Sequence, residues 1–205
     1  MEELRIEPYT EKDLQAAWQL VVDAFYGKFG VLTDLDAAGT AALCSTLWPF
    51  SANGDIEGHY LLKEGEEVVG SILLSWKPEP GKSAGSAAYG PAIGAFGLRN
   101  VLKLTLGMEI LEHRHKDREC YVGHLAVSEG HRGKGYGRKL MQFAKKTCLE
   151  DGRFDTLSLH VAAKNRPAVH LYHKLGFHVA RKWYSGINGR LYNDPYWFLM
   201  VWDCR

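Results

Sequence analysis

The sequence predicts an α+β fold, in which helices flank a mostly antiparallel β-sheet. Three observations support this prediction. Residues 120–152 read in succession as an apolar strand, a glycine-rich loop and a helix with apolar residues at three- and four-residue spacing. Residues 59–63 and 68–76 are strand-like segments on either side of a short acidic turn, which is typical of a β-hairpin. Residues 177–184 and 196–202 predict a second antiparallel pair, joined through a turn at residues 185–189.

Length and composition are those of a single domain over residues 1–205. Hydrophobic residues make up 46% of the chain and charged residues 24%, so the chain can form a sizeable core. The 25 basic and 24 acidic residues leave a net charge of +1, which gives no reason to expect nucleic acid or a membrane as a partner. The polar N-terminal segment and the lack of an apolar run of about 18 residues lead us to expect a cytoplasmic protein.

The sequence contains no convincing pattern of metal ligands. Its four cysteines form no C-x-x-C pair and read as reduced thiols. His113 and His115 form an H-x-H pair, but no third ligand stands at a suitable spacing. We therefore interpret residues 113–118 as a solvated, charged turn and expect no metal.

The first third of the chain predicts one strand and two helices. Residues 4–7 alternate as a short strand. Thr10 and Asp13 resemble a capping box, and apolar residues from 14 to 25 recur at the spacing of one buried helix face. A second helix is expected within residues 34–47. Aromatic residues around this region could line a substrate pocket, although their spacing alone does not require it.

Residues 77–118 read as an insertion before the central strand. Their first part, residues 77–97, is rich in Gly, Ser, Ala and Pro and predicts a long loop. Residues 98–113 predict a helix with a broad apolar surface, which is either well buried or shared with a second subunit in a homodimer. The loop could form a lid over an acceptor site or be a simple surface loop, and the sequence leaves both interpretations open.

The glycine-rich loop is suited to binding an anion. Glycine occupies alternate positions in Arg132-Gly133-Lys134-Gly135-Tyr136-Gly137, directly before a helix. Glycines allow tight turns and close approach of a ligand, and a helix start presents unpartnered N–H groups and a partial positive charge. Neither the G-x-G-x-x-G spacing of dinucleotide folds nor the P-loop pattern is present. The alternative interpretation is a glycine-rich turn with a solvated basic face.

Two motifs resemble the GCN5-related N-acetyltransferase (GNAT) superfamily. The first is Arg/Gln-x-x-Gly-x-Gly/Ala after a strand ending in Leu-Ala-Val, which stands here as Leu125-Ala126-Val127 followed by the run from Arg132 to Gly137. The second is Asn-x-x-Ala-x-x-x-Tyr-x-x-x-Gly-Phe, which residues 165–177 match at every fixed position. The resemblance is strong over about residues 120–180 and weak elsewhere.

The resemblance implies a central mixed, mostly antiparallel sheet and an acetyl-CoA-dependent N-acetyltransferase. Such an enzyme moves an acetyl group directly to a primary amine of a small molecule or peptide. Backbone N–H groups of the loop would hold the pyrophosphate, Asn165 the cofactor arm, and Lys174 the nucleotide phosphate. The coenzyme A-binding residues implied in this way are Leu125, Ala126, Val127, Arg132, Gly133, Lys134, Gly135, Tyr136, Gly137, Arg138, Asn165 and Lys174.

The resemblance also implies a catalytic role for Tyr172, while the position of His124 on the central strand makes it a candidate base. A phenol with a reference pKa of about 10 stays protonated at neutral pH, so Tyr172 could act as the general acid for the departing thiolate. His124 on the central strand could act as the base, and His160 on the next strand is a second candidate. Many members of the family have a carboxylate near these positions. Tyr172 could instead only pack its helix, and either histidine could be structural.

A non-catalytic acyl-CoA-binding sensor or partner-binding module is the alternative function. The presence of Tyr172 and Asn165 favours the enzyme. Dinucleotide binding is a third hypothesis, which the glycine spacing disfavours. The sequence does not identify the acceptor amine, because the regions that would set specificity have the least regular spacing.

Overall fold

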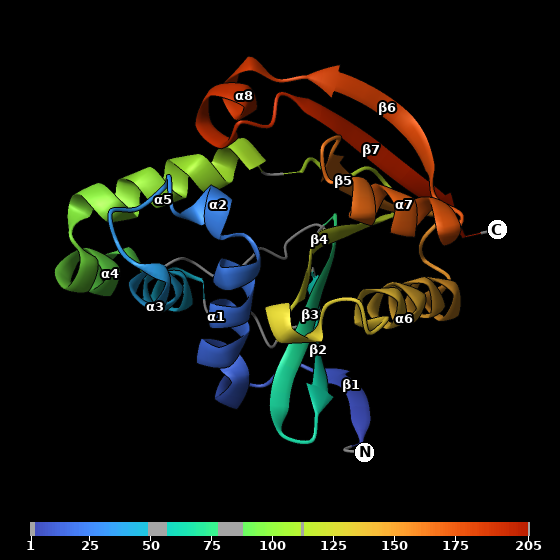
Figure 1. Ribbon diagram of the computed structural model, residues 1–205, viewed down its shortest axis with the longest axis horizontal. Coiled ribbons are helices and arrows are strands. Elements are labelled where there is room, and N and C mark those ends of the chain that lie inside the picture. Colours follow the sequence, from blue (N-terminus) through green and yellow to red (C-terminus); the bar gives the residue numbers. More distant parts are fainter. Residues whose placement is uncertain (1–2, 49–56, 78–87, 112, 205) are drawn as a thin grey trace.

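A computed structural model describes residues 3–48, 57–77, 88–111 and 113–204. These residues form a seven-stranded sheet in the order β1-β2-β3-β4-β5-β7-β6 (Figure 1). The central β4 and β5 run parallel, and every other neighbouring pair is antiparallel, which confirms the predicted fold class. The strands are β1 (Leu4–Pro8), β2 (Glu57–Glu64), β3 (Glu67–Trp76), β4 (Glu119–Val127), β5 (Thr156–Ala162), β6 (His178–Tyr184) and β7 (Tyr196–Asp203).

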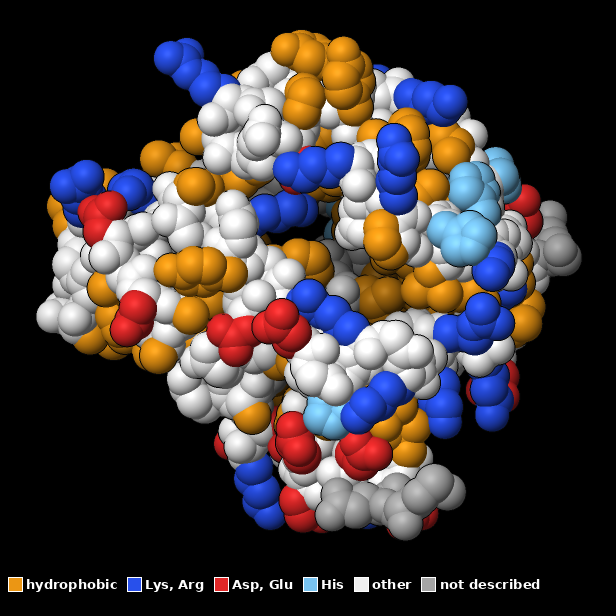
Figure 2. Space-filling model, in the orientation of Figure 1, with side chains coloured by type: hydrophobic (Ala, Val, Ile, Leu, Met, Phe, Trp, Pro, Cys, Tyr) orange, Lys and Arg blue, Asp and Glu red, His pale blue; other side chains and the backbone are white. Residues whose placement is uncertain are grey.

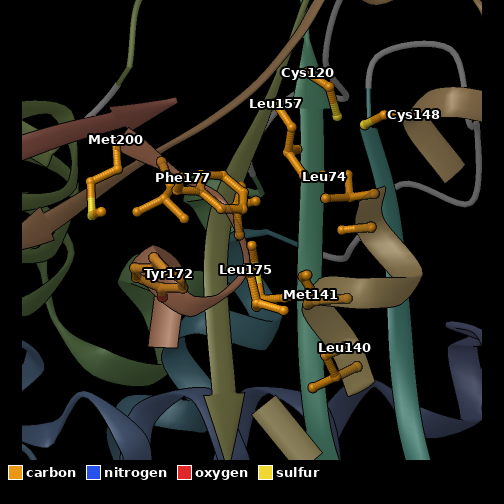
Figure 3. Close-up of a cluster of buried hydrophobic side chains, with 14 of the residues drawn as sticks. Leu74, Cys120, Leu140, Met141, Cys148, Leu157, Tyr172, Leu175, Phe177 and Met200 are labelled. Atoms are coloured by element: carbon orange, nitrogen blue, oxygen red, sulfur yellow. The ribbon is translucent and has the colours of Figure 1, made fainter. Parts of the chain in front are cut away.

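Helices cover both faces of the sheet and enclose two hydrophobic cores (Figure 1). The core under α1 also takes side chains from α3, α4 and α5. The other core lies between the sheet, α6 and α7, where Leu140 and Met141 of α6 are fully buried against strand residues such as Leu74 (Figure 3). The helices are α1 (Leu14–Ala24), α2 (Tyr26–Phe29), α3 (Ala37–Leu47), α4 (Tyr89–Phe96), α5 (Leu98–Leu111), α6 (Tyr136–Asp151), α7 (Arg166–Lys174) and α8 (Gly186–Tyr192).

The predicted capping box starts the first helical segment. The Asp13 carboxylate accepts hydrogen bonds from the Thr10 backbone N–H at 3.2 Å and from the Thr10 hydroxyl at 2.7 Å. A 3-10 turn follows, and α1 then buries Trp18, whose indole N–H donates to the Trp48 carbonyl at 3.0 Å. Trp18 is therefore a core residue. Lys63 of β2 also pairs with Asp13 at 2.9 Å, which fixes the start of α1 against the sheet.

The two central strands part near their ends. Pairing between β4 and β5 runs from Glu119–Thr156 to Val122–Leu159 and goes no further along these described strands. β4 nevertheless continues beside β3 as far as Val127, and β5 continues beside β7 as far as Ala162. An irregularity in the β3–β4 register, between Leu73 and Leu74, accompanies the separation. The edges of β4 and β5 that face each other beyond Val122 therefore offer main-chain groups to a ligand.

The structure corrects two sequence-based expectations about loops. Residues 89–96 form α4 and are not loop, and the rest of the expected lid, residues 78–87, lies outside the described residues. The connection between β6 and β7 is not a simple turn but contains α8. The Ser185 hydroxyl accepts a hydrogen bond from the Asn188 backbone N–H at 3.2 Å, an N-cap that starts this helix.

The predicted helix in the insertion is present as α5. Val101 and Leu104 on its inner face are buried, and at Gly107 the helix lies so close to the core that a Cβ would displace the Leu32 side chain. Its outer face is apolar and exposed. None of the helices in the described ranges combines the length and the apolar character needed to cross a bilayer. All four cysteines are free, and Cys44, Cys120 and Cys148 are buried, as expected of reduced thiols.

Candidate functional site

The glycine loop connects the end of β4 to the start of α6. Gly133 has φ +80° and Gly135 has φ +85°, a left-handed conformation that a residue with a Cβ adopts at a cost. A Cβ at either position would meet no atom within 4 Å. These glycines are therefore required by their backbone torsion, while the space around them is open to a ligand. The 16-residue α6 begins at Tyr136, so its first N–H groups and its positive dipole end lie at the loop.

Two side chains anchor the loop to the end of β2. The Tyr136 hydroxyl donates to Glu64 Oε1 at 3.0 Å, and His131 Nε2 lies 3.1 Å from Glu64 Oε2. His131 Nδ1 is also within 2.7 Å of the Ser128 hydroxyl. The phenol of Tyr136 is thus engaged with Glu64 and turned away from the solvent. Contact between Tyr136 and a cofactor remains a prediction, and the phenol contributes by holding the loop in place.

The predicted cationic residues around the loop are exposed. Arg132, Lys134 and Arg138 lie on the surface, and Arg132 Nε donates to the Val127 carbonyl at 3.4 Å. Gly137, in the first turn of α6, lies where three elements converge. A Cβ there would be 3.6 Å from Leu171 of α7 and 4.0 Å from Val127 of β4. The end of β4 and the start of α6, which carry the first motif, therefore meet Leu171 of α7, which belongs to the second.

Two residues predicted on α7 lie at opposite ends of that helix. The Asn165 side chain accepts a hydrogen bond from the Ala168 N–H at 3.3 Å and caps the helix start, so its amide NH₂ is left for a ligand. Lys174 is exposed at the helix end. The neighbouring Leu175 carbonyl accepts from Lys145, nine residues or about 14 Å along α6 from its start. The structure does not bring Lys174 to the glycine loop, and its phosphate contact stays a prediction.

Tyr172 points into the hydrophobic core between α7 and the sheet (Figure 3). It is 7% exposed, and its ring centroid lies 6.0 Å from that of Phe177. Burial raises the pKa of Tyr172 to about 12, so its phenol keeps its proton at neutral pH. This protonation state suits a general acid, and the burial also suits a packing role.

His124 belongs to a hydrogen-bonded chain on the other face of the sheet. Its Nε2 lies 2.8 Å from the Ser71 hydroxyl, which lies 2.7 Å from Nε2 of His59. The His59 ring in turn stacks on Tyr9 at 5.3 Å. Burial lowers the pKa of His124 to about 4 and that of His59 to about 2. Both imidazoles are therefore neutral at neutral pH.

His160 lies across the gap on β5, within an aromatic cluster. Its ring is 5.5 Å from Tyr121, 4.8 Å from Trp183 and 5.0 Å from His113. His113 also stacks on Tyr121 at 4.0 Å. Burial and the nearby His113 lower the pKa of His160 to about 4. The structure thus places one neutral histidine on each of the two parting strands.

A buried carboxylate, Glu119, contacts this cluster through His113. It is 3% exposed and accepts from the Ser158 hydroxyl at 2.6 Å and from the Lys116 backbone N–H at 2.8 Å. His113 Nε2 lies 2.9 Å from Glu119 Oε2, the oxygen that also accepts from the Lys116 N–H. Burial alone would raise the pKa of Glu119, but the hydrogen bonds from His113, the Lys116 N–H and Ser158 lower it to about 2. Glu119 is therefore ionised at neutral pH.

The interpretation of residues 113–118 as a solvated turn is wrong for His113 and His115. The His113 side chain is only 8% exposed, and its Nε2 contacts the Glu119 carboxylate. His115 Nε2 lies 2.8 Å from the Ser75 hydroxyl. Sequence reasoning also missed Glu119 itself. The available signal was the polar residues at alternate positions of β3 and β5, the two strands that flank β4. Within the described ranges, no three His, Cys, Asp or Glu side chains are grouped to hold a metal ion.

The surface is hollowed above the glycine loop, between α1–α2 and the start of α7 (Figures 1 and 2). Lys and Arg side chains border this hollow (Figure 2). Beside it, a groove of about 500 Å³ follows β6 and β7. Lys28 of α2 lies 4.5 Å over the ring of Trp197, one of the groove residues, and burial lowers the pKa of Lys28. The groove is lined by Ala163, Lys182, Trp183, Tyr184, Tyr196, Trp197 and Phe198.

The parted central strands, the glycine loop and the helix behind it define the fold class of the N-acetyltransferases. Over 98% of this chain, the structure is similar to that of NAA60 from Arabidopsis thaliana in complex with acetyl-CoA, with a TM-score of 0.60. The match covers 98% of that chain, and 17% of the aligned residues are identical, so the likeness is one of fold.

The chain belongs to the acetyltransferase (GNAT) family, whose family model matches residues 15–177. It is 40% identical over 86 residues to streptothricin acetyltransferase from Streptomyces lavendulae, a match covering 42% of each protein. It is 30% identical over 69 residues to N-alpha-acetyltransferase 50 from Danio rerio, which covers 34% of this chain and 41% of that protein. The chain therefore spans less than half the length of these relatives.

Proposed function

We propose that this protein is an acetyl-CoA-dependent N-acetyltransferase that moves the acetyl group directly to a primary amine. The observation that carries the proposal is the convergence of the parted β4 and β5 with the glycine loop, the start of α6 and Leu171 of α7. Membership of the GNAT family supports it. We further propose that residues 1–205 act as one domain, with the cofactor site in about 120–180 and an insertion in about 77–118.

The residues around the loop fit coenzyme A. The open space at Gly133 and Gly135 would admit the pyrophosphate, and the N–H groups at the start of α6 would bind it. The exposed Arg132, Lys134 and Arg138 add charge for the phosphates. Acetyl-CoA supplies the activated thioester when bound. The Val127 backbone N–H, at the end of β4, would then polarise its carbonyl oxygen as negative charge develops there.

Proton transfer is assigned to His124 and Tyr172. The neutral His124 accepts the proton of the acceptor amine, directly or through a water molecule, while its bond to Ser71 fixes the orientation of its ring. His160 is the second candidate for the base because it faces the same gap from β5. Tyr172, whose pKa is raised to about 12, donates a proton to the thiolate as it leaves. His124 and Tyr172 lie on opposite faces of the sheet, so each would serve a different reacting group, the amine or the thiolate.

The acceptor is proposed to be a small molecule or peptide with a primary amine. One relative is named streptothricin acetyltransferase, after a small molecule, and another is named an N-alpha-acetyltransferase. The names of the relatives therefore include both classes of acceptor. The aromatic groove along β6 and β7 and the hollow above the loop offer surfaces on which either could bind. A non-catalytic acyl-CoA sensor is the second candidate, favoured by the burial of Tyr172 among apolar side chains.

The test is to incubate the protein with acetyl-CoA and separate classes of amine and to identify acetylated products by mass spectrometry. The classes are polyamines, aminoglycosides, amino acids, and peptides with free N-termini or lysines. Acetylation of one class would establish the enzyme and its acceptor. Stabilisation by acetyl-CoA without any product would support the sensor. Stabilisation by NADH and not by acetyl-CoA would contradict both.

A further inference from the structure

The outer face of α5 carries a row of exposed apolar side chains. Leu98, Leu102, Leu106 and Ile110 follow one another at four-residue spacing, so they lie on one side of the helix. Their exposed fractions are 55%, 50%, 59% and 43%. A contiguous apolar row of this kind on a surface marks an interaction site more often than isolated exposed leucines do.

The exposed face is symmetric about residue 104. Leu98 and Ile110 stand six positions on either side of it, and Leu102 and Leu106 stand two positions on either side. Arg99 and Glu109, which are also exposed, stand five positions on either side and carry opposite charges. A second copy of the helix laid antiparallel across this face would therefore match apolar to apolar and Arg99 to Glu109 at both ends.

We propose that α5 pairs with α5 of a second copy in an antiparallel homodimer with two-fold symmetry. The axis passes between Leu102 and Leu106, so that Leu102 of each protomer contacts Leu106 of the other. Each Arg99 then faces the partner's Glu109, and the two pairs flank the apolar centre. Arg99 Nε lies 3.2 Å from Asp34 within its own chain, and the other N–H groups of its guanidinium can serve Glu109.

The charges on this face favour a second copy over a membrane. A helix that lies on an anionic lipid surface has Lys and Arg along its polar face. The α5 face instead has one Arg and one Glu at mirrored positions, and Lys103 beside it is paired with Asp34 at 2.8 Å. This arrangement is neutral and self-complementary, which is the pattern of an isologous interface.

Helix α4 enlarges the proposed interface. The 14-residue α5 is about 21 Å long and about 10 Å wide, which is small beside the roughly 800 Å² per partner of a typical interface. Tyr89 and Ile93 of α4 are 46% and 38% exposed and extend the apolar surface. Both helices lie at one edge of the molecule, away from the glycine loop and α7 (Figure 1). Pairing there leaves the candidate site open.

The experiment is to measure molar mass by light scattering after size exclusion, together with the dimer dissociation constant by sedimentation. The wild type is expected near 46 kDa, twice the 23.0 kDa of the chain. Leu102→Glu places like charges beside the symmetry axis, and we expect it to weaken the dimer by at least about a hundredfold. A wild type that is monomeric at about 100 µM would overturn the proposal, as would a Leu102→Glu variant that stays dimeric.

Charge reversal tests the antiparallel register separately. Arg99→Glu and Glu109→Arg each turn two attractive contacts into repulsive ones, and we expect each to weaken the dimer by about tenfold. The double variant restores opposite charges and should recover the wild-type constant. An equimolar mixture of the two single variants should form heterodimers preferentially. Equal dissociation constants for all these proteins would refute the register. Unchanged thermal stabilisation by acetyl-CoA, measured on every variant, shows that the fold is intact.

Discussion

Replacing Glu119 with glutamine should destabilise the protein strongly at neutral pH and much less in acid. Glu119 is held ionised by His113, Ser158 and the Lys116 N–H, and its pKa falls from 4.5 to about 2. A difference of about 2.5 pKa units corresponds to about 3 kcal/mol of stability at pH 7. Because the folded pKa is the lower one, this stabilisation is complete above pH 4.5 and is lost as the pH falls towards 2. About 1 kcal/mol should remain at pH 3.

The assay is urea unfolding of the wild type and of Glu119→Gln at pH 7 and pH 3. The difference in free energy of unfolding between the two proteins should shrink by about 2 kcal/mol between these pH values. Glu67→Gln is the matched control, because Glu67 is exposed at the start of β3 and its substitution should change stability by less than about 0.5 kcal/mol. A Glu119→Gln penalty that is independent of pH would show that the charge of Glu119 contributes nothing, and would refute the reasoning.

Three further predictions concern the candidate site. Tyr172→Phe should lower kcat by about 10² to 10⁴ while leaving acetyl-CoA affinity unchanged, and an unchanged kcat in the thiol-release assay would exclude the general acid. Gly135→Ala forces a Cβ into φ +85° and should cost about 1–2 kcal/mol and weaken acetyl-CoA binding. Gly130→Ala, whose Cβ would also meet no atom within 4 Å and whose φ is ordinary, should bind acetyl-CoA normally in the same calorimetric titration. Because the pKa of His124 is about 4, ionisation of the enzyme should lower kcat/KM only as the pH approaches 4, once protonation of the acceptor amine itself has been accounted for. A further loss of activity that reports an ionisation of His124 near pH 6.5 would contradict its neutral state.

The parts of the fold that local signals determine were predictable from sequence. The capping box of Thr10 and Asp13 and the β2–β3 hairpin each depend on residues within a few positions of one another. The left-handed torsions of Gly133 and Gly135 follow from the same local logic, since glycine is the residue that adopts them readily. Sequence-based prediction was correct there because local preference and tertiary structure agree.

The contacts that join distant segments could not be read from spacing. The sequence around His113 is typical of a solvated charged turn, whereas in the fold His113 packs against Glu119 and Tyr121. β4 and β5 part while each continues to pair with its other neighbour, β3 or β7. No single residue in the sequence indicates this separation. α8 has a recognisable N-cap in Ser185, but its short glycine-containing sequence is equally typical of a turn.

The measurement that tests the central claim most directly is the rate of thiol release from acetyl-CoA with and without a primary amine, for the wild type and for Gly135→Arg. We predict release that depends on the amine for the wild type. Gly135→Arg should lose this activity together with acetyl-CoA binding, because it fills the open space at the loop and strains a positive φ. Amine-dependent release at an equal rate by the variant would show that acyl transfer does not take place at the glycine loop and the parted strands.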